Sequence, residues 1–365
     1  MENLGQCLYC SSPANSLEHV LPAAFGEFTG APNLENRVCD ECNNKRLGVL
    51  DEQLARCGPE GFFRRWYGIE GRAHHDKVNP FYRGSAGGRR QEFSAFDPVW
   101  GVEVNLEIEN GQARQLRELI FVESSGKTHH LPIREDATAE RLLQAFKALG
   151  VIKPFEARLS CDPGERAWLE PILRQAWPAA EFGEGTPGSK VFAGAVGKVE
   201  LNARYFRAFA KIGFHYFLTQ FNSYTGHEPS FSRLREFISD DVAGPVSRVN
   251  EFIGVRQHPL LGEMLNPNAR PDGWRAHLVC AEVISGGCFA HVQMFLTEDW
   301  PAPTYTIRLA AADPAVVGNG AAGHIYRYYP DGLRGRFSGE AESLLTTRTN
   351  FAAPPPAPAV TSAGD

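Results

Sequence analysis

Apolar and polar residues alternate along several stretches after residue 96, which is the pattern of strands with one buried face. Four aliphatic residues alternate with polar neighbours between positions 102 and 108, and Asn110-Gly111 then predicts a tight hairpin turn before a strand at 119–122. The end of the chain shows similar patterns, at 274–284, 287–297, 303–311 and 323–329. These stretches predict an antiparallel sheet.

Apolar residues that recur every three or four positions predict helices between these stretches. Leu47, Leu50 and Leu54 form one apolar stripe, which predicts a helix over 43–56 that stops at Gly58-Pro59. Thr138 predicts the N-cap of a helix over 139–149, and Gly150 predicts its end. Further helices are expected over 164–176, 200–222 and 230–239. The segment 200–222 is apolar on most of its faces, so we expect it to be buried.

Helices and antiparallel strands together predict an α+β fold. A chain of 365 residues is long enough for two or three domains. We expect a compact module over 1–57, a connector over 58–95 rich in glycine, arginine and aromatic residues, and a larger α+β domain over 96–350. The tail over 351–365 is rich in proline and alanine, and we expect it to be disordered.

Composition changes this picture little. Apolar residues make up 43 % and charged residues 22 %, as in ordinary globular proteins. No stretch resembles a signal peptide or a membrane span, so we expect a cytoplasmic protein without a membrane partner. The net charge of −6 does not point to nucleic acid.

The charge is nevertheless uneven along the chain. Residues 1–55 hold three basic and eight acidic side chains, a balance of −5, and residues 56–95 hold eight basic and four acidic ones, a balance of +4. The basic segment contains Arg64 and Arg65, which could contact phosphates as part of a nucleic-acid-binding arm. An ordinary solvated linker explains the same pattern equally well.

The eight cysteines fall into two groups. Two C-x-x-C pairs, Cys7 with Cys10 and Cys39 with Cys42, have the spacing of a tetrahedral zinc site. Such an ion would close the long loop between the pairs and replace the core that so short a module cannot build. Because a four-cysteine site has no open coordination position, we expect this zinc to be structural. The other four cysteines are scattered, and we interpret them as buried apolar residues or incidental thiols.

The polar residues between and beside these cysteines suit cleavage of a phosphodiester with the help of a metal ion. Glu18 and Asn43 offer the hard oxygen ligands that Mg²⁺ and Mn²⁺ prefer. A free histidine side chain has a pKa near ~6.5, which suits His19 to the role of general base at neutral pH. If 17–21 is a regular strand, Glu18 and His19 point to opposite faces, so a shared site requires a distorted strand or a loop.

The module contains, in this order, the motifs C-x-x-C, E-H-V-x-P and N-x-x-C-x-x-C-N and then an Asp. Together these motifs resemble those of the HNH, or ββα-metal, endonucleases, and in particular of their zinc-bearing subgroup. The resemblance covers roughly residues 5–56. It implies metal-dependent hydrolysis of DNA, with RNA a less favoured substrate. By analogy, the domain over 96–350 would recognise the target or sense a signal.

The resemblance also assigns roles to individual residues. His19 is implied as the general base, Glu18 and Asn43 as ligands of the catalytic Mg²⁺ or Mn²⁺, and the four paired cysteines as zinc ligands. Asn36 is implied as the asparagine that braces the loop, with Asn33 as its rival. Lys45 and Asp51 resemble positions that flank the site, Lys45 as a nucleic-acid contact. Asp51 could brace His19, lie behind the metal ligands or face solvent.

Other interpretations stay open. His19 could be structural, Glu18 could pair with Arg37 or Arg46, and Asn43 could only cap the helix that follows it. The main rival function is a zinc-binding adaptor without catalytic activity that holds nucleic acid or protein. A second rival places an unrelated enzymatic activity in the larger domain.

Overall fold

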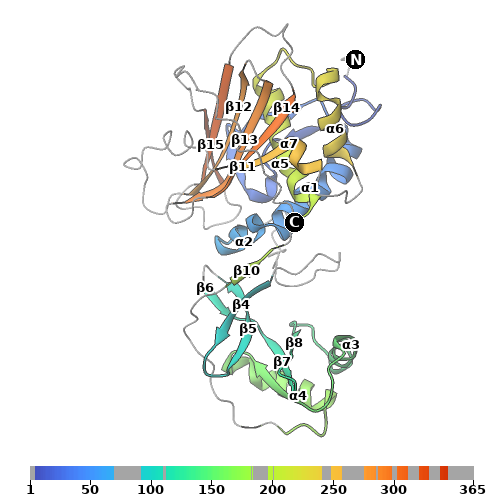
Figure 1. The fold of residues 1–365 in the computed structure, drawn as a ribbon, viewed down its shortest axis with the longest axis vertical. Helices are drawn as coiled ribbons and strands as arrows, with labels where there is room; N and C mark the ends of the chain where they lie inside the picture. The colour runs from blue at the N-terminus through green and yellow to red at the C-terminus, as the bar shows by residue number, and fades with distance from the viewer. Residues whose placement is uncertain are drawn as a thin grey trace, which may run out of the picture.

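The structure is a computed structural model that describes residues 5–69, 92–109, 112–181, 183, 196–199, 201–240, 248–256, 275–284, 287–297, 302–310, 320–328 and 338–343. In Figure 1 the described elements form an upper body around a large sheet and a lower body of smaller sheets, with helix α2 (Pro59–Trp66) between them. The predicted α+β class with mainly antiparallel sheets is confirmed.

The upper body is built on a seven-stranded sheet. Its strand order is β11 (Ile253–Arg256), β14 (Thr304–Ala310), β13 (Gly287–Thr297), β12 (Arg275–Ile284), β15 (Gly320–Tyr328), β16 (Ser338–Ser343) and β2 (Glu27–Thr29). All neighbours pair antiparallel except β16 and β2, which pair parallel. The strands predicted near the end of the chain are therefore confirmed, and a strand from the N-terminal module completes one edge of their sheet.

Helix α5 (Ala203–Gln220) packs against this sheet and is buried along most of its length, as its apolar sequence predicts. The side chain of Asn202 caps it by accepting a hydrogen bond from the backbone N–H of Tyr205. A Cβ at Gly213 would lie 2.9 Å from the Cβ of Ala290, so glycine is what allows the helix to approach the sheet so closely. Helices α6 (Ser232–Ser239) and α7 (Val249–Phe252) and the short turn η3 (Pro229–Phe231) complete this layer.

The N-terminal residues share one hydrophobic core with α5 and the large sheet. Residues such as Phe25, Leu47 and Leu54 belong to the same buried cluster as Phe209 of α5 and Ile307 of β14. The module predicted over 1–57 thus packs on the rest of the upper body through a continuous apolar interior.

Strands of the lower body form two sheets. One has the order β10 (Val196–Lys198), β4 (Glu92–Asp97), β5 (Val102–Glu109), β6 (Gln112–Gln115). The other has the order β8 (Thr128–Pro132), β7 (Glu118–Glu123), β9 (Phe155–Ser160), and it carries α3 (Ala139–Leu149) and α4 (Pro163–Ala176). The antiparallel pairing of β5 with β6 confirms the predicted hairpin. Its turn, Asn110-Gly111, lies outside the described residues.

The N-terminal module consists of a small hairpin and a helix. Strands β1 (Leu17–His19) and β3 (Asn33–Glu35) pair antiparallel, with the turn η1 (Ala23–Phe25) and β2 between them in the chain. The predicted helix is present, but it opens as a π-helix, η2 (Cys42–Leu47), before continuing as α1 (Gly48–Cys57).

Two other expectations concern the connector and the tail. Helix α2 lies where the sequence was expected to run as a connector without periodicity, because eight residues are too few to show a clear helical repeat. The last residues of the predicted connector, 92–95, belong to strand β4. Residues 70–91 and the tail over 351–365 lie outside the described residues. Among the described helices, none combines the length and the apolar character that crossing a bilayer requires.

Candidate metal and active site

The four paired cysteines come together at one point. The Sγ atoms of Cys7, Cys10, Cys39 and Cys42 all lie within 4.8 Å of one another, and those of Cys10 and Cys39 are 3.5 Å apart. Sulfurs bound at 2.3 Å to one tetrahedral zinc ion would be about 3.8 Å apart, so this arrangement fits a single ion. Both pairs also receive backbone N–H groups, for example from Tyr9 to Cys7 and from Cys42 to Cys39. The predicted clustering of the four cysteines is therefore confirmed, and their spacing could hold one metal ion.

This cluster ties the hairpin to the helix. Cys7 and Cys10 lie in the turn that precedes β1, and Cys39 and Cys42 lie where the helix begins. In the hairpin, Glu18 pairs with Leu34 and His19 with Asn33. An antiparallel strand pair followed by a helix is the ββα order that the resemblance implies.

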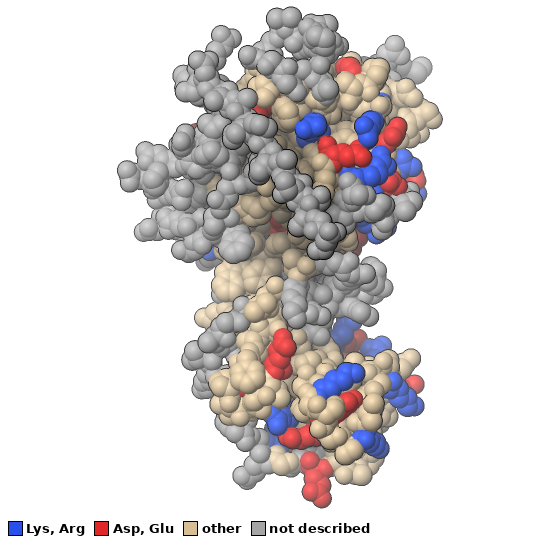
Figure 2. All heavy atoms as spheres, in the orientation of Figure 1, with Lys and Arg blue, Asp and Glu red and all other residues tan. Residues whose placement is uncertain are grey.

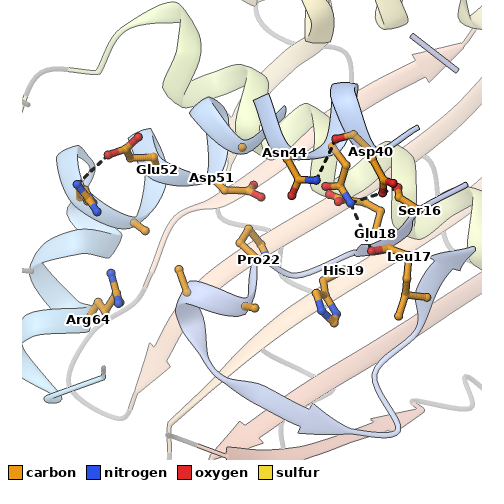
Figure 3. A pocket seen from close by; sticks show the side chains of 16 residues that line it. Ser16, Leu17, Glu18, His19, Pro22, Asp40, Asn44, Asp51, Glu52 and Arg64 are labelled. Carbon is orange, nitrogen blue, oxygen red and sulfur yellow. Dashed lines mark hydrogen bonds and ion pairs between the residues drawn. The ribbon is translucent and has the colours of Figure 1, made fainter. Parts of the chain in front are cut away.

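A cavity of about 600 Å³ opens between the hairpin and the helices α1 and α2 (Figure 3). Its wall contains three of the four residues that the sequence analysis placed in the reaction beside the zinc cluster, namely Glu18, His19 and Asn43. Asn36, the fourth, does not line it. The remaining polar wall consists of Ser16, Asp40, Asn44, Asp51, Glu52, Arg56 and Arg64.

Asn33 orients His19. The Nδ1 of His19 lies 2.9 Å from the Oδ1 of Asn33, and because an amide oxygen only accepts, Nδ1 carries the hydrogen. The Nε2 atom of His19 then keeps its lone pair for a proton. Asn36 is exposed and adopts a left-handed backbone with a φ of 51°, which asparagine tolerates well. Asn33, the rival in the sequence analysis, is thus the asparagine that contacts His19.

Glu18 and His19 reach the same cavity although they are neighbours in a strand. The side chain of Glu18 turns into the core, where it is 3 % exposed, whereas His19 is half-buried and turns toward β3. The strand ends after His19, so the geometry of a long regular strand does not apply.

Lys211 of α5 holds Glu18 from inside the protein. Its Nζ lies 2.7 Å from Oε1 of Glu18 and 2.6 and 2.8 Å from the two carboxylate oxygens of Asp51. Burial raises the pKa of Glu18, but the charge of Lys211 and the nearby His215 outweigh it and lower that pKa to about 2. Glu18 is therefore an ionised carboxylate held by Lys211. The alternative partners Arg37 and Arg46 donate instead to the backbone carbonyls of Thr225 and Tyr9.

The same network extends to Tyr9, which lies between Cys7 and Cys10. The Nδ1 of His215, also on α5, lies 3.7 Å from Oε1 of Glu18, and its Nε2 lies 2.7 Å from the hydroxyl of Tyr9. Burial lowers the pKa of His215, so the ring is neutral at pH 7. Glu18 and Asp51 thus share the ammonium group of Lys211, and His215 adds no positive charge to the network.

Sequence reasoning missed Lys211 and His215 because they lie far from the cysteine motifs in the chain. One signal could have found them: they are polar residues inside a helix whose other faces are almost entirely apolar. A buried charge in such a helix requires a partner.

Glu18 and Asn43, which the sequence analysis assigned to a divalent cation, both line the cavity. Asn43 donates through Nδ2 to Oγ of Ser16 at 3.3 Å and to the carbonyl of Leu17 at 3.4 Å. Its Oδ1 accepts no hydrogen bond from any described residue and belongs to a side chain that lines the cavity. A carboxylate and an amide oxygen in one cavity are the kinds of oxygen ligand that Mg²⁺ and Mn²⁺ prefer.

The three predicted nucleic-acid contacts have different surroundings. Lys45 is exposed and pairs with Glu41 at 3.0 Å, and Arg65 donates from Nε to the carbonyl of Ile108 at 2.8 Å. Arg64 is buried and lines the cavity. On the face drawn in Figure 2, the described basic and acidic side chains are intermingled on both bodies and gather into no continuous basic patch.

Comparison of the chain with protein-family models, with characterised proteins and with solved structures finds no match. The function is therefore inferred from the sequence motifs and from the geometry of the cavity and of the cysteine cluster.

Proposed function

We propose that this protein is a metal-dependent endonuclease in which His19 activates water for hydrolysis of a phosphodiester bond. The observation that carries the proposal is the environment of His19. Asn33 fixes its Nδ1–H, its other nitrogen is left as a base, and it shares one cavity with the carboxylate of Glu18 and the amide oxygen of Asn43.

Each of these residues has a definable task. Nε2 of His19 takes a proton from water as the water oxygen bonds to phosphorus and the bond from phosphorus to the leaving sugar oxygen breaks. The leaving oxygen takes a proton from solvent, and the imidazolium later releases its own. Mg²⁺ or Mn²⁺ held by Glu18 and Asn43 would supply stabilisation of the negative charge that builds on the phosphate. Lys211 keeps Glu18 ionised and fixed for that role.

The cysteine cluster has a structural role in this proposal. Four thiolates close the coordination sphere of a zinc ion, so it cannot bind water or substrate. Zinc would instead fix the start of the helix against the turn before β1, and with them the positions of Asn43 and Glu18. DNA is the favoured substrate, as the resemblance to the HNH endonucleases implies, and RNA is the alternative.

The test is cleavage of supercoiled plasmid with Mg²⁺ or Mn²⁺. We expect the wild-type protein to nick or linearise it and His19→Ala to be slower by at least about 100-fold, the usual contribution of a general base. His227→Ala is the matched control, because His227 is exposed and lies outside the cavity wall. It should cut like wild type.

The main rival, a zinc-binding adaptor, makes the opposite prediction. A protein that binds DNA or RNA with its zinc in place, but leaves both intact with either metal, would overturn the nuclease proposal. Cleavage that survives His19→Ala would overturn the role of His19 and point to an activity elsewhere in the chain.

A further inference from the structure

Arg64 is a buried cation without an anion. It is 5 % exposed, and its Nε is shielded from solvent and has no hydrogen-bond partner. No described carboxylate forms an ion pair with its guanidinium. Burying an unpaired charge is costly, so a protein keeps one only where something compensates it.

The compensating group does not come from the neighbouring helix. Arg56 of α1 acts on Arg64 as another cation and is itself paired with Glu52 at 2.7 Å. Burial first, and then the charge of Arg56, lower the pKa of Arg64 to about 10, so the guanidinium is still charged at neutral pH.

The cavity is where a partner can reach Arg64. Arg64 belongs to its wall together with His19, Glu18 and Asn43, and Figure 3 shows it on the α2 side, across the cavity from His19. The wall therefore has one end with carboxylate and amide oxygens for a cation and another end with an unpaired guanidinium for an anion.

We infer that Arg64 is an anion subsite that binds a backbone phosphate of the polynucleotide next to the phosphate that is cut. This assignment rests on the proposed function for the identity of the strand, but the need for an oxyanion comes from Arg64 alone. A planar guanidinium presents two parallel N–H groups to two phosphate oxygens, which suits phosphate well. The cavity, at about 600 Å³, can hold a phosphate and an adjoining sugar.

Arg64→Met separates a binding role from a structural one, because the two roles predict opposite changes in stability. An unpaired buried cation destabilises the free protein, so Arg64→Met should raise the melting temperature, by about 2–4 °C. Arg207 is the matched control. It is equally buried at 2 %, but its guanidinium is held by Asp240, so Arg207→Met should lower the melting temperature.

Binding is measured with inorganic phosphate and with a short single-stranded DNA, in a His19→Ala background so that no strand is cut. Phosphate should raise the melting temperature of the His19→Ala protein and leave that of the same protein with Arg64→Met unchanged. The oligonucleotide should bind at least about tenfold more weakly to Arg64→Met. The slope of log affinity against log salt should fall by about 0.7, the value for one lost phosphate contact on a single strand. Arg64→Lys should keep most of that slope, since it keeps the charge.

Two results overturn the inference. The first is that phosphate and the oligonucleotide bind equally well to the parent protein, which keeps Arg64, and to Arg64→Met. The second is that acetate stabilises the parent protein as strongly as phosphate does, which would mean that the ligand is a carboxylate. The plasmid assay tells this failure from that of the proposed function. Binding through Arg64 without cleavage by the wild type would support the subsite and refute the nuclease, and cleavage unaffected by Arg64→Met would do the reverse.

Discussion

Lys211 and Glu18 are 193 positions apart in the chain, and the Nζ of Lys211 lies 2.7 Å from Oε1 of Glu18 in the interior of the protein. The lysine side chain is fully buried and that of Glu18 nearly so. The carboxylate of Asp51, on helix α1, forms an ion pair with the same ammonium group. A helix from the second half of the chain thus supplies the countercharge for two carboxylates that lie within the first 51 residues.

Lys211→Met should destabilise the protein strongly. The substitution keeps the length of the side chain but leaves Glu18 buried without its cation, and removing one partner of a buried pair costs about 3–5 kcal/mol. We expect the lower end of that range, because Asp51 is partly exposed and can turn to water. Urea unfolding at pH 7 measures the loss.

The control for that change is Lys45→Met. Lys45 and Glu41 form an ion pair in which both side chains are largely exposed, at 74 and 69 %. Such pairs contribute little, so the free energy of unfolding should change by less than about 0.5 kcal/mol. Equal losses for Lys45→Met and Lys211→Met would mean that the buried network does not stabilise the fold.

Acid should weaken this network in a defined pH range. The pKa of Glu18 is about 2 in the folded protein, against an ordinary value of 4.5. A lowered folded pKa contributes stability that is fully present above pH 4.5 and is lost as the pH falls toward 2. The expected outcome is that Glu18→Gln removes much of the acid sensitivity between pH 4.5 and 2. Parallel urea titrations of variant and wild type over this range would refute the assignment if their slopes were the same.

Glu60 should produce the opposite dependence. Burial raises its pKa to about 7, although hydrogen bonds from its own backbone N–H and from the hydroxyl of Tyr205 oppose the change. A raised carboxyl pKa means that the folded protein binds the proton more tightly, so stability falls as the pH rises from 4.5 through 7. Glu60→Gln keeps an oxygen for Tyr205 and cannot ionise. Its stability relative to wild type should therefore rise by roughly 2–3 kcal/mol between pH 4.5 and 8.

The comparison between variant and wild type is what isolates Glu60. Buried histidines such as His277, whose pKa burial lowers to about 3, make the folded protein more stable as the pH rises, and they act in both proteins alike. If the difference in the free energy of unfolding between Glu60→Gln and wild type does not change with pH, the pKa of Glu60 is the same in the folded and unfolded protein, and the prediction is wrong.

The elements that the sequence predicted well are those set by local signals. Thr138 accepts a hydrogen bond from the N–H of Arg141 at the start of α3, and Gly150 ends that helix with a φ of 65°. The cysteine cluster belongs to this class too, because each C-x-x-C pair lies within one short segment of the chain and the spacing of the two pairs is visible in the sequence. Such features depend on a few neighbouring residues, and a single sequence contains all of them.

The interior of the candidate site could not be predicted in this way. Which residue neutralises Glu18 depends on how α5 packs on the hairpin, and that packing is decided by the apolar core the two share. Likewise, Asn33 and Asn36 are both asparagines just before the second cysteine pair, and only the pairing of β1 with β3 brings Asn33 opposite His19. The sequence identifies both asparagines as candidates, and the register of the β1–β3 pair shows which of them contacts His19.

Metal analysis tests the cysteine cluster. We expect about one zinc ion per chain in the purified protein. The Cys39→Ser variant should lose the ion and have a lower melting temperature, because the substitution removes a buried sulfur that is one of the four ligands. Cys161→Ser is the matched control, since Cys161 lies in the lower body outside the cluster. Elemental analysis and thermal unfolding decide the matter. Wild-type protein that is free of metal and is not stabilised by added zinc would contradict the prediction.

Asn33→Ala tests how His19 is held. Without the amide oxygen, Nδ1 of His19 has no fixed acceptor, and the ring is free to rotate or to place its hydrogen on Nε2. Misplacement of a reacting group by about 1 Å costs on the order of 100-fold, so we expect kcat for plasmid cleavage to fall by about 10–100-fold with little change in KM.

The Asn33→Asp variant retains an acceptor at the same place and should recover much of the rate. Because a carboxylate stabilises the imidazolium, it should also shift the basic group in the pH–rate profile to a higher pKa. A purely structural asparagine would give neither the recovery nor the shift. If Asn36→Ala instead caused the larger loss of kcat, the brace implied by the family resemblance would be correct, and the hydrogen bond between Asn33 and His19 would have no part in the reaction.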